Sequence, residues 1–159
     1  MFQELPRSPP SCENGAMEAD GLFVYGTLRE GGSRHAWLQR TEPEGSCRAW
    51  VAGRLFHLPH EGYPAMIAVP EPTGPPPASG WVTGSFIGYA DEGALEAALQ
   101  DLDQLEDVDG GLFERRILPI RLEAGPQYHA WVYLFPEDRL PRLEREAVEL
   151  AVGDWSPYL

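Results

Sequence analysis

A carboxylate on the apolar face of a predicted helix is the first chemical feature of the sequence. The stretch "EGALEAALQDLDQLE", residues 92–106, carries leucines at intervals of four and three, which predict an amphipathic helix. Glu106 follows Leu102 by four residues, so a helix that continues to Glu106 places this side chain on the buried face. Asp101 and Asp103 flank Leu102 and are expected to point away from that face, toward solvent.

The position of Glu106 predicts an unusual acidity. Burial, the negative end of the helix dipole and the neighbouring Asp107 all disfavour the charged carboxylate and would raise its pKa. A carboxyl group with a pKa near neutrality suits general acid/base catalysis. Two alternatives remain open: the helix end frays and Glu106 turns outward, or Glu106 forms an inward ion pair with Arg115 or Arg29.

A glycine turn after an apolar strand is the second feature. In "LFVYGTLREGG", residues 22–32, Gly26 ends the strand, and the turn exposes consecutive backbone N–H groups. Such groups bind a carboxylate or stabilise an oxyanion. Ser33 is expected to cap a short helix, "SRHAWLQ", whose dipole would add to the same preference. The alternative is an ordinary tight turn.

Several other chemistries are disfavoured by composition and spacing. All 12 cationic residues are arginines, which excludes a Schiff-base lysine and the lysine of a phosphate-binding loop. Two cysteines, Cys12 and Cys47, cannot build a disulfide framework or a thiolate metal site. His57 and His60 would point to different faces, the acidic run lacks calcium-loop spacing, and Ser85 does not lie in a nucleophile elbow. We predict neither a metal nor a cofactor.

The bulk properties indicate one globular domain. The chain has 159 residues and a formal net charge of -13, which argues against a nucleic-acid partner. No apolar run reaches the length of a membrane span, and the N-terminus lacks the pattern of a signal peptide. We therefore predict a flexible tail at 1–20, a single domain at 21–159, no membrane association and a cytoplasmic location.

The elements that must position Glu106 and the glycine turn are mostly strands. Aromatic and β-branched stretches bounded by glycine or proline predict strands at 22–25, 47–58, 63–69, 81–89, 113–122 and 128–135. Asp91 is expected to cap the helix at 92–106, "EAGPQ" to form a turn, and a charged helix to lie near 141–151. This order predicts an α+β domain whose sheet, mixed or antiparallel, curls into a small barrel with flanking helices.

Four motifs in this order carry a resemblance to a known family. "FVYGTLREG", "GYPAMI", "VTGSFIGY" and "LDQLEDVDGGLFERR", within residues 22 to 135, resemble the gamma-glutamylcyclotransferase-like family, in particular its gamma-glutamylamine cyclotransferase type. The resemblance implies a small mixed barrel with flanking helices. It also implies an intramolecular aminolysis, in which the α-amine of a γ-glutamyl group attacks its own γ-carbonyl and releases 5-oxoproline.

The resemblance also assigns residues. Glu106 would be the general acid/base that takes the proton of the α-ammonium and returns it to the leaving nitrogen. The substrate, a small γ-glutamyl amine or amino acid, would be bound by a set of residues led by the backbone amides of the turn: Tyr25, Gly26, Thr27, Leu28, Arg29, Phe113 and Arg115. Phe113 stands where a tyrosine is common, and Ser85 where an acidic residue is frequent.

Two further interpretations stay open. The chain could be a noncatalytic domain that binds a small molecule or a partner in the same cleft, or it could hydrolyse the amide and form glutamate.

The ending "GDWSPYL" could close over the cleft or fill the end of the barrel, and we expect the structural role.

Overall fold

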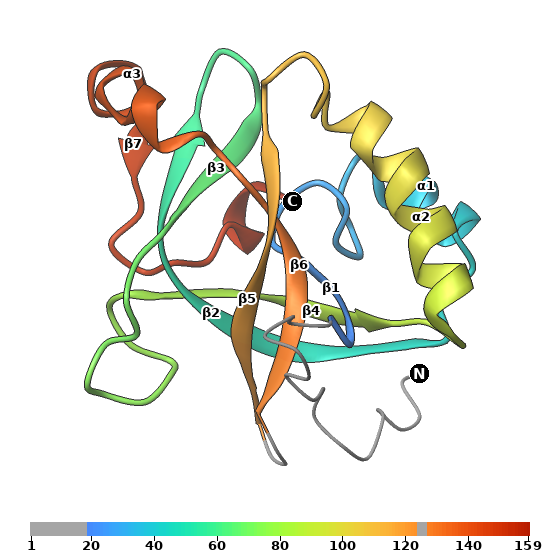
Figure 1. The fold of residues 1–159 in the computed structure, drawn as a ribbon. Helices are drawn as coiled ribbons and strands as arrows, with labels where there is room; N and C mark the ends of the chain where they lie inside the picture. The colour runs from blue at the N-terminus through green and yellow to red at the C-terminus, as the bar shows by residue number, and fades with distance from the viewer. Residues whose placement is uncertain (1–18, 124–126) are drawn as a thin grey trace.

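A computed structural model describes residues 19–123 and 127–159 (Figure 1). Most of the predicted tail, Cys12 and the centre of the predicted turn at 123–127 lie outside these residues. Asp20, which the sequence placed in the tail, is tied to the sheet: its N–H donates to the His129 carbonyl at 2.7 Å, and its carboxylate accepts from the His129 N–H at 3.0 Å. The hydrogen-bonded chain therefore includes Asp20.

Five strands close into a barrel, as predicted. They are β1 (Gly21–Val24), β2 (Gly45–Leu58), β4 (Trp81–Gly88), β5 (Glu114–Leu122) and β6 (Tyr128–Leu134). Their order is β2-β4-β1-β6-β5, and β5 returns to β2 by pairing Ala49 with Leu122 and Trp50 with Arg121. Only the β1–β6 pair is parallel, so the barrel is mixed (Figure 1).

The long strand β2 serves two parts of the sheet. Its first half pairs with β4, and from Gly53 onward it pairs with β3 (Tyr63–Ala68). The short strand β7 (Val148–Glu149) pairs with β2 at Phe56 and His57. The start of β3 lies against the predicted glycine turn after β1, since a Cβ atom on Gly26 would lie 2.5 Å from Pro64 Cγ.

Side chains alternate between two apolar layers. On β6, residues 128, 130, 132 and 134 point into the barrel, whereas Tyr133 and the following Phe135 belong to the layer outside it. On β1, Phe23 points inward while Leu22 and Val24 point outward. This is the two-residue period of a strand, and it leaves an apolar outer face that a helix must cover.

Helix α2 (Glu92–Leu105) covers that face, with four buried side chains in its stripe: Leu95, Ala98, Leu99 and Leu102. The Asp91 carboxylate accepts from the Ala94 N–H at 2.8 Å, which confirms the predicted cap. The short helix α1 (His35–Arg40) contacts α2 (Figure 1). The prediction that Ser33 caps α1 is wrong, because the cap position is Arg34 and no side chain caps this end.

The C-terminal part differs from the predicted helix at 141–151. A 3₁₀ turn (Glu137–Arg139) leads into α3 (Leu140–Glu146), which ends because Ala147 is extended and β7 pairs with β2 instead. No helix in residues 19–123 or 127–159 is long and apolar enough to cross a membrane.

The ending "GDWSPYL" packs against the barrel. Trp155 is 3% exposed within the barrel core, and its indole N–H donates to His57 Nδ1 at 3.0 Å. Tyr158, in a final 3₁₀ turn (Ser156–Tyr158), stacks on the His57 ring with centroids 3.9 Å apart. These contacts support the structural role for this segment.

Candidate active site

A cavity of about 580 Å³, including its open mouth, lies where β1, β3, β6 and the end of α2 meet. Its wall combines the glycine loop, by which we mean residues 25–28, with Glu106, Arg34 and an apolar and aromatic remainder: Phe23, Val24, Tyr63, Pro64, Leu105, Leu112, Phe113 and Tyr133. A concave, mostly apolar site with few polar groups is the usual form of a small-molecule site.

The Glu106 side chain lies in this wall. The residue terminates α2 rather than continuing it, since its N–H still bonds the Leu102 carbonyl at 2.9 Å but its backbone leaves the helical region. The side chain is 15% exposed, and burial raises the pKa of the carboxyl group to about 7. The alternative of an ion pair with Arg29 or Arg115 is not found among the described residues. Instead, Arg34 Nη1 lies 3.6 Å from Glu106 Oε1, and its positive charge lowers the pKa of Glu106.

The glycine loop presents backbone donors. The Arg29 N–H closes the turn by donating to the Gly26 carbonyl at 3.0 Å. Within the part of the chain that the structure describes, the N–H groups of Gly26, Thr27 and Leu28 donate to no protein acceptor. A Cβ atom on Gly26 would lie 2.5 Å from Pro64 Cγ, so only glycine fits here. The loop can therefore offer N–H groups to a ligand in the cavity.

Two tyrosines link the glycine loop to β6 and to α2. The Tyr25 hydroxyl donates to the Tyr133 carbonyl at 2.6 Å, and the pKa of Tyr25 is raised by burial and by the charge of Glu106. The Tyr133 hydroxyl donates to Asp103 Oδ1 at 2.7 Å. Asp103 also accepts two bonds from Arg115, at 2.8 and 2.9 Å. The expectation that Asp103 points to solvent is therefore wrong.

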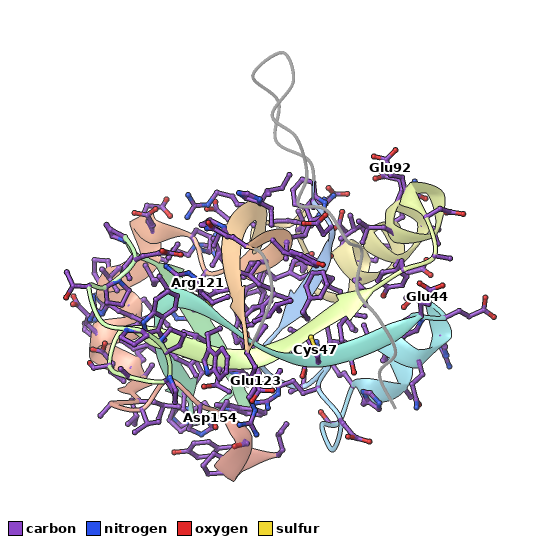
Figure 2. All side chains as sticks on the ribbon, turned by 90° about the horizontal axis from the view of Figure 1, so that it is seen from below. Glu44, Cys47, Glu92, Arg121, Glu123 and Asp154 are labelled. Carbon is purple, nitrogen blue, oxygen red and sulfur yellow. The ribbon has the colours of Figure 1, made fainter. Side chains whose placement is uncertain are left out.

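Six of the eight predicted site residues line the cavity together: Tyr25, Gly26, Thr27, Leu28, Glu106 and Phe113. Arg29 and Arg115 do not line it. Arg29 forms an ion pair with Asp154 of the C-terminal segment at 3.3 Å (Asp154 is labelled in Figure 2). Arg115 forms an ion pair with Asp103, and its guanidinium carbon lies 4.2 Å from the centre of the Trp131 ring. A direct contact of either arginine with substrate remains a prediction.

The sequence matches the family described as gamma-glutamyl cyclotransferase, AIG2-like, over residues 22–157. The chain belongs to this family. Membership confirms the predicted fold and indicates a gamma-glutamylcyclotransferase enzyme. A relative from Niallia circulans, gamma-L-glutamyl-butirosin B gamma-glutamyl cyclotransferase, is 27% identical over 149 residues, which are 91% of this chain and 80% of the relative.

Solved structures share the fold of this gamma-glutamyl cyclotransferase family member at low sequence identity. YkqA from Bacillus subtilis is 21% identical with a TM-score of 0.57; the match covers 89% of this chain but only 41% of that chain. An AIG2-like protein from Mus musculus is 20% identical with a TM-score of 0.53, covering 77% and 84% of the two chains. A protein specific to uropathogenic E. coli is 20% identical with a TM-score of 0.52, covering 89% and 96%.

Sequence reasoning missed eight residues of the cavity wall as site residues: Phe23, Val24, Arg34, Tyr63, Pro64, Leu105, Leu112 and Tyr133. Strand alternation could have placed Tyr133, because it shares the outer face with Phe135 two positions later. Pro64 lies in the quoted motif "GYPAMI". Arg34 carries no such signal, since its position depends on the fold of the loop that precedes α1.

Metal and thiol chemistry find no support in the described residues of this cyclotransferase family member. No group of three or more His, Cys, Asp or Glu in residues 19–123 and 127–159 is placed to hold a metal ion. Cys47 on β2 does not line the cavity, and burial together with Glu123 raises the pKa of its thiol (Figure 2). A thiolate nucleophile is thereby disfavoured.

Proposed function

We propose that this protein catalyses the intramolecular aminolysis of a γ-glutamyl amine or γ-glutamyl amino acid and releases 5-oxoproline, with Glu106 as general acid and base. The observation that carries the proposal is a cavity shared by two groups: a carboxyl group with a pKa of about 7, and a loop with three backbone N–H groups that donate to no acceptor among the described residues. The first can move protons at neutral pH, and the second can bind developing negative charge.

The proposed proton transfers and bond changes take place within the substrate and Glu106. The ionised carboxylate accepts a proton from the α-ammonium, because an ammonium nitrogen has no lone pair for attack. The free amine then attacks the γ-carbonyl carbon, and the new C–N bond closes a five-membered ring. The glycine loop stabilises the resulting oxyanion through its N–H groups. Protonated Glu106 gives its proton to the leaving nitrogen as the original C–N bond breaks. The ionised carboxylate then takes the second proton of the ring nitrogen and passes it to the released amine, which leaves as an ammonium ion.

The pKa of Glu106 suits both halves of this cycle. A carboxyl group with an ordinary pKa would accept the ammonium proton poorly, and a much stronger base would not return it to the leaving nitrogen. At a pKa of about 7 the group exists in both forms near neutral pH. Because the attacking amine and the carbonyl belong to one molecule, the protein needs only to hold the glutamyl chain in a folded conformation.

The substrate class is supported by the relative from Niallia circulans, whose name gives a γ-glutamyl group on butirosin B as its substrate. The cavity of this chain is partly open to solvent, and the Arg34 side chain in its wall is 39% exposed. A γ-glutamyl group bound inside can therefore carry its amine or amino acid outward through the mouth. The leaving group then needs no fully enclosed pocket.

The proposal is tested by mass spectrometry for 5-oxoproline after incubation of the protein with a panel of γ-glutamyl amines and γ-glutamyl amino acids. Glu106→Gln keeps the shape of the side chain but cannot move the proton. Glu96→Gln, on the exposed face of α2, is the matched control. We expect 5-oxoproline from the wild type and from the control, and none above background from Glu106→Gln.

Two results would contradict the proposal in different ways. Glutamate as the product would identify hydrolysis in the same cavity. Ligand binding with no product from a folded wild-type protein, across the panel, would identify a noncatalytic binding domain.

A further inference from the structure

Arg34 is the one cationic side chain among the described residues that line the cavity. Its backbone is attached to the glycine loop, because its N–H donates to the Thr27 carbonyl at 2.9 Å. Its guanidinium Nη1 lies 3.6 Å from Glu106 Oε1. The cavity therefore holds an anion and a cation side by side, at the place where the proposed reaction starts.

A γ-glutamyl group carries the complementary pair. Its α-ammonium and α-carboxylate are attached to the same carbon atom, so the two charges are necessarily close together. We propose that Arg34 binds the α-carboxylate of the substrate while Glu106 faces the α-ammonium, which makes Arg34 the residue that selects γ-glutamyl compounds over amides without this carboxylate. This inference rests on the proposed function. A planar guanidinium matches a carboxylate with two parallel hydrogen bonds.

The ion pair in the free protein leaves Arg34 available for this role. At 3.6 Å the contact with Glu106 exceeds the length of a charge-assisted hydrogen bond, about 2.7–2.9 Å. The Arg34 side chain is also 39% exposed, so a ligand in the cavity can reach its guanidinium group. Substrate binding then exchanges one carboxylate for another beside the same guanidinium.

A cation in the cavity would offset the negative charge of the whole chain. With a formal net charge of -13, the protein repels an anionic group at long range, although salt screens that field over about 10 Å. Among the described residues that line the cavity, Glu106 carries the carboxyl group, and it repels the carboxylate of a ligand whenever it is ionised. Arg34 offsets both effects at short range. The N–H groups of the glycine loop are then left for the γ-carbonyl oxygen.

The test compares two ring compounds that differ by the carboxylate alone. Binding of 5-oxoproline and of 2-pyrrolidinone is measured by calorimetry with the wild type, Arg34→Gln, Arg34→Lys and Arg40→Gln. Arg40 lies on α1 over the Trp37 ring, outside the cavity wall, and is the matched control. We expect Arg34→Gln to weaken the affinity for 5-oxoproline at least about 10-fold, as for a lost hydrogen bond to a charged group. The affinity for 2-pyrrolidinone should stay unchanged.

The lysine variant reports on geometry. Arg34→Lys keeps the positive charge but cannot form the two parallel hydrogen bonds of a guanidinium group. Its affinity for 5-oxoproline should therefore fall between those of the wild type and Arg34→Gln. Equal weakening of both rings by Arg34→Gln, no weakening of either, or wild-type protein that binds 5-oxoproline no better than 2-pyrrolidinone would overturn the inference.

Failure of the inference and failure of the proposed function give different results. If the wild type forms 5-oxoproline and Arg34→Gln keeps its KM for a γ-glutamyl amine, the reaction stands and the role of Arg34 is refuted. If the wild type forms no 5-oxoproline but binds it through Arg34, the carboxylate site stands and the reaction is refuted.

Discussion

Glu106→Gln should stabilise the folded protein at alkaline pH while it abolishes turnover. In the wild type, burial raises the pKa of Glu106 from 4.5 to about 7. A carboxyl group whose pKa is raised on folding is easier to accommodate in the folded protein when it is neutral. The stability of the folded protein therefore falls as the pH rises from about 4.5 through 7 and the group becomes ionised. Glutamine is neutral at every pH and escapes the loss.

The magnitude follows from the two pKa values. A shift from 4.5 to about 7, at about 1.4 kcal/mol per pKa unit, gives a penalty of about 3 kcal/mol at pH 8, where the group is ionised in both states. At pH 5 the folded group is neutral and the unfolded group is only partly ionised, so the penalty is about 1 kcal/mol. The stabilisation by Glu106→Gln should therefore grow by about 2 kcal/mol between pH 5 and pH 8.

Urea denaturation at both pH values measures this difference. All other ionisable groups are common to the two proteins, so their pH dependence cancels when the variant is compared with the wild type. Glu96→Gln, at an exposed position of the same helix, should show no comparable pH-dependent gain. If Glu106→Gln gains no more over the wild type at pH 8 than at pH 5, the Glu106 carboxyl group is not desolvated in the folded protein.

Three further predictions concern the support of the cavity. Gly26→Ala should sharply reduce turnover and cost about 1–3 kcal/mol of stability, because the new Cβ would lie 2.5 Å from the Pro64 ring; normal kinetics and unchanged thermal unfolding would show that the loop has room. Asp103→Asn should cost about 1–3 kcal/mol in urea denaturation, because the Tyr133 hydroxyl and a bidentate arginine lose a charged acceptor; unchanged stability would refute this network. Trp155→Ala should cost about 3–5 kcal/mol by removing a 3% exposed ring from the barrel core, while the KM of the folded fraction stays unchanged; a raised KM with full stability would instead identify a lid.

Local patterns in the sequence were enough to predict α2 and its cap. Leucine spacing fixed the buried face of the helix, and the position of Glu106 relative to Leu102 placed the carboxyl group on that face. Six strands, β1 to β6, were also predicted, since aromatic and β-branched residues mark them. The cause of the raised pKa was predicted only in part: burial acts as expected, but the charge that modulates it is Arg34.

Long-range pairings could not be predicted from the sequence. Barrel closure depends on the register between β2 and β5, which are far apart along the chain. Asp103 on α2 is bonded by Tyr133 on β6, which is 30 residues away along the chain. Local spacing alone therefore suggested that Asp103 is exposed. Helix α3 was predicted too long because Val148 and Glu149 pair with β2, and tertiary pairing overrides helix propensity there.

The pH dependence of 5-oxoproline formation tests the central claim most directly. Initial rates at low concentration of the best γ-glutamyl substrate should give a kcat/KM that falls below about pH 7 with the protonation of one group, since Glu106 must be ionised to accept the ammonium proton. Glu106→Gln should form no product above background at any pH. A rate that stays constant from pH 8 down to pH 5, or near-normal turnover by Glu106→Gln, would contradict the assignment of Glu106 as the proton carrier.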